Sequence, residues 1–368
     1  MKIAYLSNSP LKSGAANAVH VMHMCSCFSN LGHVVGLFAK GSKKDDYFSR
    51  YGITSSFKLI LIEAGNVRFV SAFLYGFLQS FRAKIFFKPD LCYARCFISA
   101  FFALALGMPI IIEVHELPHN RILDLIFRYV FKNKNTKRVV VISKGLCDDL
   151  MCQYTDMREM EVVIAHDGAS ITRQNFEQFF LQRGEGCQIG YAGGMRSGNG
   201  IGLIIDLANM FQHHTFHLLG GSEENIKYWA KLQKGRNIVW YGHQQSYVVS
   251  GFLKSCDILL APYQEGPKTG AGRDTSRWMS PLKIFEYMAS GQPMIASDFP
   301  VLREILSEKT ALLVTPGKLN EWASALEYLI THKSSRERIG SSALQVLQAE
   351  FTWEKRAQKV LKGLCEFC

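Results

Sequence analysis

The chain has 368 residues, of which 48% are hydrophobic and 20% charged, which is enough for two domains with full cores. Its formal net charge is +11, but no nucleic-acid-binding module is recognisable, so we expect anionic small-molecule or membrane partners and no nucleic acid. Ten cysteines form neither a paired framework nor a four-ligand zinc spacing, so we expect a reduced, cytoplasmic protein without a structural metal.

The N-terminal residues predict a strand rather than a signal peptide. Residues 2–7 form a first buried strand, residues 15–30 a helix and residues 34–39 a second strand, which is the unit of a doubly wound sheet. The intervening loop holds Gly14 and Ala15, where backbone can approach a ligand closely. A bare turn explains the same residues, and the loop is not the G-x-G-x-x-G of dinucleotide-binding proteins.

Residues 67–87 predict a helix rich in aromatic residues. Phe69, Phe73, Phe77 and Phe81 recur at every fourth position, a stripe that usually faces a core. The helix is flanked by basic residues, Arg68, Arg82 and Lys84. A surface for a membrane or a lipid acceptor is therefore the alternative interpretation.

The strand at residues 109–114 leads directly into polar residues. Ligands of α/β proteins bind just beyond the carboxyl ends of parallel strands, which makes His115 a candidate site residue. A metal site made of His115, Glu116 and His119 is an alternative, although loops of this kind lack the fixed ligand spacing of zinc motifs. Glu113 or Glu116 as a general base also stays open.

A second domain begins after a polar linker at about residues 171–186. A strand at 187–192 is followed by a glycine-rich loop, residues 193–200, whose N–H groups could bind an anion. Further strands follow, including residues 237–242. The long polar loop at residues 263–279 carries Lys268, Arg273, Asp274 and Arg277, and we expect it to face substrate.

Residues 280–291 predict a short helix with both ends marked. We expect Ser280 to cap it, Pro281 to occupy its first position and Gly291 to end it. Lys283 and Glu286 share one face. A cation at a helix N-terminus suits a diphosphate, and a carboxylate one turn later suits two sugar hydroxyls, although an ordinary surface pair has the same spacing.

The run SPLKIFEYMASGQPMIASD, residues 280–298, resembles the donor-site helix of glycosyltransferase family 4, retaining enzymes of the GT-B fold. The family motif has two glutamates separated by seven residues. Glu286 matches the second, which implies ribose binding, whereas Trp278 stands in place of the first. His115 matches a family histidine that contacts the donor sugar. In the glycine-rich loop the family's diphosphate-binding Arg and Lys are replaced by Gly194 and Asn199, which leaves Arg196.

The resemblance implies a GT-B fold in which two Rossmann-like doubly wound domains face each other across a cleft. We expect an acceptor domain at residues 1–172, a donor domain at 187–350 and a C-terminal helix at 351–368 that crosses back to the first domain. The catalytic candidates are His115, Arg196 and Lys283. The predicted substrate-binding residues are Gly14, Ala15, Gly193, Gly194, Asn199, Tyr241, Ser280, Pro281, Leu282 and Glu286.

The expected reaction moves a sugar from a UDP- or GDP-linked donor to a hydroxyl of a glycan or lipid-linked acceptor. We expect retention of configuration, no cofactor and no metal, with peripheral contact to the inner face of a membrane as a further hypothesis. One alternative is a sugar-nucleotide epimerase of the same fold. Another is a catalytically weak sugar-nucleotide or glycan-binding subunit, suggested by Trp278, Gly194 and Asn199 at positions where the family has other residues.

Overall fold

The computed structural model describes residues 1–42, 44–55, 57–62, 70–171, 179–182, 184–196, 198–264 and 276–364. By their internal contacts the residues fall into two compact units, Met1–Asp167 with Trp353–Cys368 and Gly168–Thr352. Several residues singled out in the sequence lie outside the described residues: Arg68, Phe69, Lys268, Arg273, Asp274 and half of the predicted linker.

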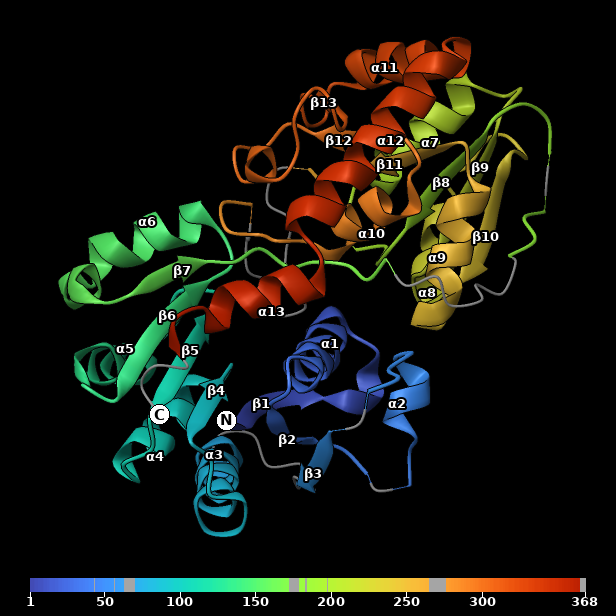
Figure 1. Ribbon diagram of the computed structural model, residues 1–368. Helices are drawn as coiled ribbons and strands as arrows, with labels where there is room; N and C mark the ends of the chain where they lie inside the picture. Colours follow the sequence, from blue (N-terminus) through green and yellow to red (C-terminus); the bar gives the residue numbers. More distant parts are fainter. Residues whose placement is uncertain are drawn as a thin grey trace. The chain divides into compact units, whose positions relative to one another are not determined.

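The first unit is built on a seven-stranded parallel sheet with the order β3-β2-β1-β4-β5-β6-β7 (Figure 1). Its strands are β1 (Lys2–Pro10), β2 (Val34–Lys40), β3 (Lys58–Ile62), β4 (Leu91–Ala94), β5 (Ile110–Val114), β6 (Thr136–Val141) and β7 (Val162–Ile164). Its helices are α1 (Ala16–Asn30), α2 (Tyr47–Arg50), α3 (Val70–Arg82), α4 (Phe97–Ala105), α5 (Arg121–Lys132), α6 (Lys144–Gln153) and α13 (Trp353–Leu361). Shorter helical turns are η1 (Leu11–Ser13), the π-helical η2 (Ala83–Phe87) and η3 (Thr155–Glu159).

The chain reverses its direction across this sheet between β1 and β4. From β1 it moves outward to β2, whereas from β4 it moves to β5 on the other side. Right-handed crossovers in opposite directions place α1 and α4 on opposite faces. The helices α3, α4 and α5 pack side by side, and α13 packs against α1 (Figure 1). Both faces of the central strand β1 are therefore covered, which explains why residues 3–7 are all buried.

The second unit is built on a six-stranded parallel sheet with the order β10-β9-β8-β11-β12-β13. Its strands are β8 (Gln188–Ala192), β9 (Thr215–Leu219), β10 (Ile238–Gly242), β11 (Ile258–Ala261), β12 (Met294–Ser297) and β13 (Leu312–Val314). Its helices are α7 (Ile201–Met210), α8 (Glu223–Ala230), α9 (Ser246–Ser255), α10 (Leu282–Ser290), α11 (Leu319–Thr331) and α12 (Lys333–Glu350), with a turn η4 (Leu302–Glu304).

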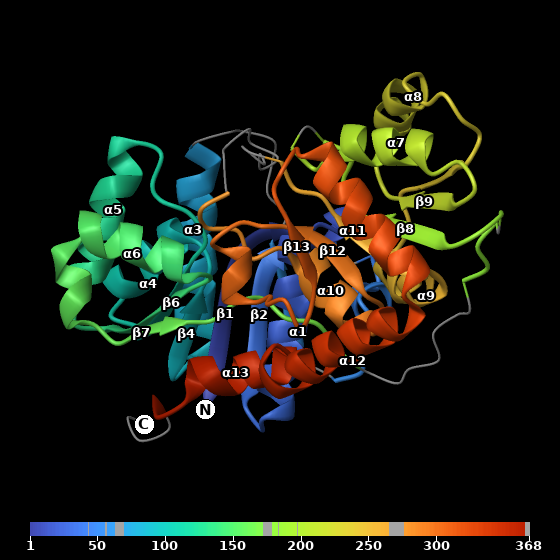
Figure 2. The ribbon, with the colours of Figure 1, turned by 90° about the horizontal axis from the view of Figure 1, so that it is seen from above.

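Two hydrophobic cores sandwich the second sheet. Along β11, Ile258 and Leu260 belong to one core and Leu259 and Ala261 to the other, as the alternation of a strand requires. Helix α10 belongs to the second of these cores and packs against α9 and α12 (Figure 2). The prediction of two doubly wound parallel α/β sheets is confirmed.

Candidate functional site

In each sheet a loop with predicted site residues follows the strand at which the strand order reverses. The first sheet reverses between β1 and β4, and Gly14 and Ala15 follow β1. The second reverses between β8 and β11, and the glycine-rich loop follows β8. Such points, at the carboxyl ends of the strands, are where open parallel sheets bind ligands.

Helix α10 begins one residue later than the sequence predicted. Pro281 is its N-cap, with φ −80° and ψ 121°, and Leu282 is the first helical residue. The expectation that Ser280 caps the helix with Pro281 inside it is therefore wrong, because the extended ψ of Pro281 keeps it outside the helix. Proline has no side-chain oxygen, so no cap hydrogen bond is made to the first turn. The predicted end is confirmed, since Gly291 is left-handed with φ 73°.

Lys283 lies over the glycine-rich loop. A Cβ atom on Gly193, where φ is 151°, would come within 2.8 Å of the Lys283 Cε atom, so a side chain at this position would displace the end of the lysine. The Lys283 ammonium sits 4.0 Å from the ring centre of Tyr191 and 4.7 Å from that of Tyr263. Burial lowers the pKa of Lys283 to about 7 against a smaller raising effect of Glu286. An anion that binds beside Lys283 would raise its pKa and so favour the protonated form.

Glu286 lies one turn further along α10. Burial raises the pKa of its carboxyl, and the Lys283 charge partly opposes that rise. The helix itself is fixed by Tyr287, whose hydroxyl accepts from the Ala192 N–H at 2.8 Å and donates to the Leu260 carbonyl at 3.2 Å. These bonds join α10 to the carboxyl ends of β8 and β11, so Lys283 and Glu286 are carried to that edge of the sheet.

The rest of the glycine-rich loop is held by its own hydrogen bonds. The Gly194 carbonyl accepts from the Tyr191 hydroxyl at 2.7 Å and from the Asn199 amide at 2.6 Å. The side-chain amide of Asn199 therefore stabilises the loop, and its N–H group is not available to a ligand. The Arg196 side chain is exposed, and no hydrogen bond or ion pair of its guanidinium is found among the described residues.

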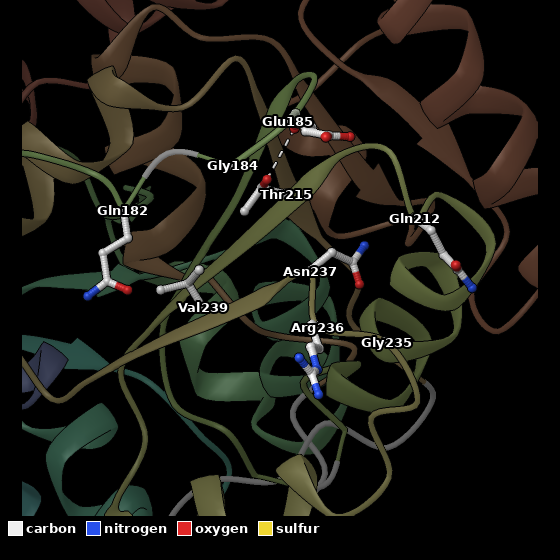
Figure 3. Close-up of a pocket in the computed structure, with 9 residues that line it drawn as sticks. All are labelled: Gln182, Gly184, Glu185, Gln212, Thr215, Gly235, Arg236, Asn237 and Val239. Carbon is white, nitrogen blue, oxygen red and sulfur yellow. Dashed lines mark hydrogen bonds between the residues drawn. The ribbon is translucent and has the colours of Figure 1, made fainter.

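Tyr241 is engaged inside the second unit. Its hydroxyl accepts from the Gln182 backbone N–H at 3.0 Å and lies 3.0 Å from His217 Nδ1. A hollow of about 430 Å³ lies nearby, at the amino-terminal starts of β9 and β10 (Figure 3). It is lined by Gln182, Gly184, Glu185, Gln212, Thr215, Gly235, Arg236, Asn237 and Val239. It occupies the edge opposite to the glycine-rich loop, so it is not the donor site that the sequence predicts.

In the first unit the loop after β1 is open. Gly14 and Ala15 are exposed, and no atom lies within 4 Å of a Cβ built on Gly14. Ala15 is the N-cap of α1 and makes no side-chain cap, and the first turn of α1 carries no acidic residue. The positive end of this helix therefore faces outward, as an anion site requires.

His115 follows β5 and is held by two charged neighbours. Its Nε2 lies 2.6 Å from Glu113 Oε1 and 2.8 Å from Arg95 Nε, and its Nδ1 lies 3.3 Å from Arg95 Nη2. Burial and the Arg95 charge lower the pKa of His115 to about 4, so the ring is neutral. With 23% of its side chain exposed, His115 is the accessible end of a buried polar cluster.

Glu113 is the centre of that cluster. It is fully buried and accepts from the Tyr93 hydroxyl and from both Arg356 nitrogens, each at 3.2 Å. Burial alone would raise its pKa, but Arg356, His20 and hydrogen bonds hold the pKa well below the usual value. His20 lies 3.0 Å from Glu113 Oε1 and 2.7 Å from Asp167 Oδ1. Both oxygens of the Glu113 carboxylate thus already accept hydrogen bonds, which makes Glu113 a poor general base.

The three potential metal ligands that meet among the described residues are His20, Glu113 and His115. The predicted alternative of His115, Glu116 and His119 is not brought together as such a group. Arg95 and Arg356 both face the Glu113 carboxylate, and these two positive charges oppose the binding of a divalent cation.

Sequence reasoning missed the supports of His115. His20, Asp167 and Arg356 come from positions far apart in the chain, and only folding brings them to Glu113. One signal was available for Arg356: it shares a helix face with Trp353, Ala357 and Val360, which are all buried. Tyr191 and Tyr263 beside Lys283 had no comparable signal, because aromatic residues at strand ends are common.

Each of the two units matches a family of known proteins. Residues 18–171 match the family described as Glycosyltransferase Family 4, and residues 186–332 match Glycosyl transferases group 1. A putative teichuronic acid biosynthesis glycosyltransferase, TuaH of Bacillus subtilis (strain 168), is 26% identical over 132 residues, which are 36% of this chain and 32% of the relative. That match spans about a third of the relative's length.

Solved structures resemble the whole chain. Sucrose-phosphate synthase (tll1590) from Thermosynechococcus elongatus has a TM-score of 0.74 at 16% identity and covers 100% of this chain and 99% of its own. Anabaena Alr3699/HepE in complex with UDP and glucose has a TM-score of 0.73 at 16% identity, with 99% of each chain covered.

These likenesses confirm the GT-B fold, and the chain is a glycosyltransferase of the GT-B type. The two family matches lie in different units and together span most of the chain. Both matches are to glycosyltransferase families, with a Glycosyltransferase Family 4 domain at residues 18–171 and a Glycosyl transferases group 1 domain at residues 186–332. No helix among the described residues is long and apolar enough to cross a membrane.

Proposed function

We propose that the protein transfers a sugar from a nucleotide-sugar donor to a hydroxyl of a glycan or lipid-linked acceptor, with retention and without a metal. The observation that carries this proposal is Lys283, which lies over Gly193 at the uncapped start of α10. A cation, a helix N-terminus and a close backbone approach together suit the diphosphate of such a donor.

Lys283 would act at the leaving group. As the glycosidic bond breaks, negative charge grows on the diphosphate, and the helix dipole and the protonated lysine would stabilise it. Because the free lysine has a pKa of about 7, much of this charge would be acquired with the ligand. Arg196, exposed on the same loop, would add a second cation. Glu286 would hold the ribose hydroxyls.

No protein carboxylate is needed as a base in this proposal. Glu113 stays ionised, but its oxygens are occupied by Tyr93, His115 and Arg356. The leaving phosphate would instead accept the proton of the acceptor hydroxyl, which fits retention without a pair of catalytic carboxylates. His115 remains the candidate for the sugar contact, because its neutral ring is partly exposed.

A UDP-linked donor is the first choice to test. The HepE structures contain UDP, glucose or UDP-glucose, and the TuaH name refers to teichuronic acid biosynthesis. We carry over to this chain only the class of donor, with GDP-linked sugars as the next candidates. The acceptor would be a growing glycan or its lipid-linked precursor.

The test is release of nucleoside diphosphate from a panel of UDP- and GDP-sugars, with and without a membrane lipid extract. We expect release from one donor, an increase with lipid, and loss of the signal in Lys283→Met. Lys227→Met, at an exposed position on α8, is the matched control. An isomerised sugar nucleotide formed without acceptor would indicate an epimerase.

Nucleotide binding without any turnover would favour the binding-subunit alternative. One observation supports that alternative. Asn199 stands where the family has a lysine, and its amide is bonded to the Gly194 carbonyl, so Arg196 is the cation that the described part of the glycine-rich loop provides.

A further inference from the structure

The first unit exposes large apolar side chains on two helices with the same spacing. On α3 they are Leu74, Phe77 and Phe81, and on α5 they are Ile122, Leu125 and Tyr129. Both sets follow i, i+3, i+7, the period of one helix face. The stripe on α3 continues into η2, where Ile85 is 47% and Phe86 77% exposed. A soluble surface rarely gathers so many large apolar groups.

Helix α4 joins the two stripes into one surface. Phe77 contacts Phe102 with ring centres 5.6 Å apart, and Phe101 contacts Tyr129 at 5.0 Å. Phe101 and Phe102 are themselves in contact and partly exposed. The three helices lie side by side on one face of the sheet (Figure 1). We call the exposed side chains of α3, η2, α4 and α5 the aromatic face.

The aromatic face is bordered by positive charge. Arg82, Lys84 and Lys88 border the stripe on α3 and η2, and Arg121 begins α5. Across α3, η2, α4 and α5 the sequence has a single acidic residue, Asp124, which is paired with Arg128 at 2.9 Å. The basic border therefore has no nearby acid in these elements to neutralise it.

We propose that the aromatic face docks on a lipid bilayer that contains anionic lipids. Aromatic and aliphatic side chains would enter the boundary between headgroups and acyl chains, and the basic border would contact lipid phosphates. A second copy of the chain suits this face less well, because a symmetric pair would bring like charges together. The docking deepens the proposed function, on which its biological meaning rests, since a lipid-linked acceptor would lie at this surface.

The test is co-sedimentation of the full chain with vesicles of phosphatidylcholine alone or mixed with phosphatidylglycerol. We expect binding to the mixed vesicles that weakens with salt. Each basic residue near an anionic surface contributes about fivefold, so the pair Lys84→Gln and Arg121→Gln should lower the partition coefficient about thirtyfold. The pair Phe86→Ser and Leu125→Ser should lower it tenfold or more.

The matched control is Tyr228→Ser with Leu232→Ser, two exposed apolar residues of the second unit, at 61% and 49% exposure. It should bind vesicles as the wild type does. The proposal is overturned if the wild type ignores anionic vesicles at low salt, or if the control pair loses as much binding as the aromatic-face pair. It is also overturned if Phe86→Ser with Leu125→Ser converts a dimer to a monomer while the wild type does not bind vesicles.

Vesicle binding needs no donor, so this result is independent of the proposed reaction. A protein that binds vesicles but releases no nucleoside diphosphate would keep the docking surface and refute the reaction. The reverse result would refute the docking surface alone.

Discussion

Arg356 is the residue around Glu113 whose replacement should lower the stability of the first unit most. Its guanidinium lies 3.2 Å from each Glu113 oxygen and donates to the backbone carbonyls of His166 at 2.9 Å and Ala165 at 3.2 Å. Arg356 is 3% and Glu113 1% exposed. Arg356→Met keeps the aliphatic length and removes the charge and every one of these donors.

The expected loss follows from the burial of the partner. Removing one member of a buried ion pair costs about 3–5 kcal/mol, because the other charge stays buried and uncompensated. The two carbonyls that lose a donor would each add about 1–3 kcal/mol if the terms were independent. They share one side chain and are not additive, so we expect about 3–5 kcal/mol in total. At about 1.4 kcal/mol per factor of ten, opening of the unit becomes roughly a hundred- to several-thousand-fold more frequent.

Hydrogen–deuterium exchange resolved by peptide measures this loss in the first unit and uses the second as an internal reference. Peptides from β5 and α13 should exchange faster by that factor, while peptides from β11 and β12 should not change. Lys359→Met, an exposed change on the same helix, is the control. Equal protection of β5 in the two variants would refute the reasoning.

The pH dependence provides a second check on the same variant. In the wild type the pKa of Glu113 is held well below its usual value, so its stabilising effect is present above the unfolded pKa of about 4.3 and is lost as pH falls through the folded pKa. Without Arg356, burial raises the pKa of Glu113, and protonation removes the uncompensated charge. The difference between variant and wild type should therefore shrink at acid pH.

The remaining predictions concern the candidate donor site. The affinity for UDP-glucose, whose diphosphate does not titrate near neutrality, should fall as pH rises through and above about 7, because Lys283 loses its proton; calorimetry of Lys283→Met should show a flat profile. The folded pKa of Lys283 lies below its unfolded value of about 10.4, so the unfolded chain binds more protons between these values, and thermal stability should rise with pH there in the wild type but not in the variant. Glu286→Ala should weaken nucleotide binding by about 1.5–3 kcal/mol if its carboxylate bonds the ribose, as isothermal titration would show. Gly193→Ala should weaken UDP-glucose binding in calorimetry, because the new Cβ would displace Lys283, and it should also lower the melting temperature, because the φ of 151° at Gly193 strains a residue with a side chain. Treatment with a chelator should leave nucleoside diphosphate release unchanged.

Most strands of the two sheets could be predicted from the sequence because they have a local signal, whereas β4 and β13 were not predicted. Buried parallel strands such as Ile110–Val114 and Ile258–Ala261 are short apolar runs bounded by turns, and the helices between them carry a helical period. The pairing of Lys283 with Glu286 on one face also followed from spacing alone. The start of α10 did not, since Ser280 and Pro281 fit two adjacent cap positions equally well, and only the ψ of Pro281 decides between them.

The cluster around Glu113 could not be predicted in this way. Its members lie at positions 20, 113, 167 and 356, and no spacing within any one segment relates them. Lys283 shows the same limit on a smaller scale: its sequence neighbours suggest a charged surface residue, whereas the loss of contact with water in the folded chain lowers its pKa. Electrostatic character is a property of the assembled environment rather than of the motif.

The two candidate sites differ in how their surroundings affect a charged residue: the neighbours of Glu113 favour its charged form, whereas those of Lys283 disfavour it. Glu113 is buried among cations and kept ionised, and its Oε1 lies 2.6 Å from Nε2 of His115. Lys283 is half-buried beside the aromatic rings of Tyr191 and Tyr263, and its pKa of about 7 makes its charge sensitive to what binds beside it. The first arrangement suits a rigid contact to a neutral sugar, and the second suits a phosphate group whose charge grows during the reaction. Because Arg356 comes from α13, the cluster around Glu113 is complete only when α13 has packed against α1.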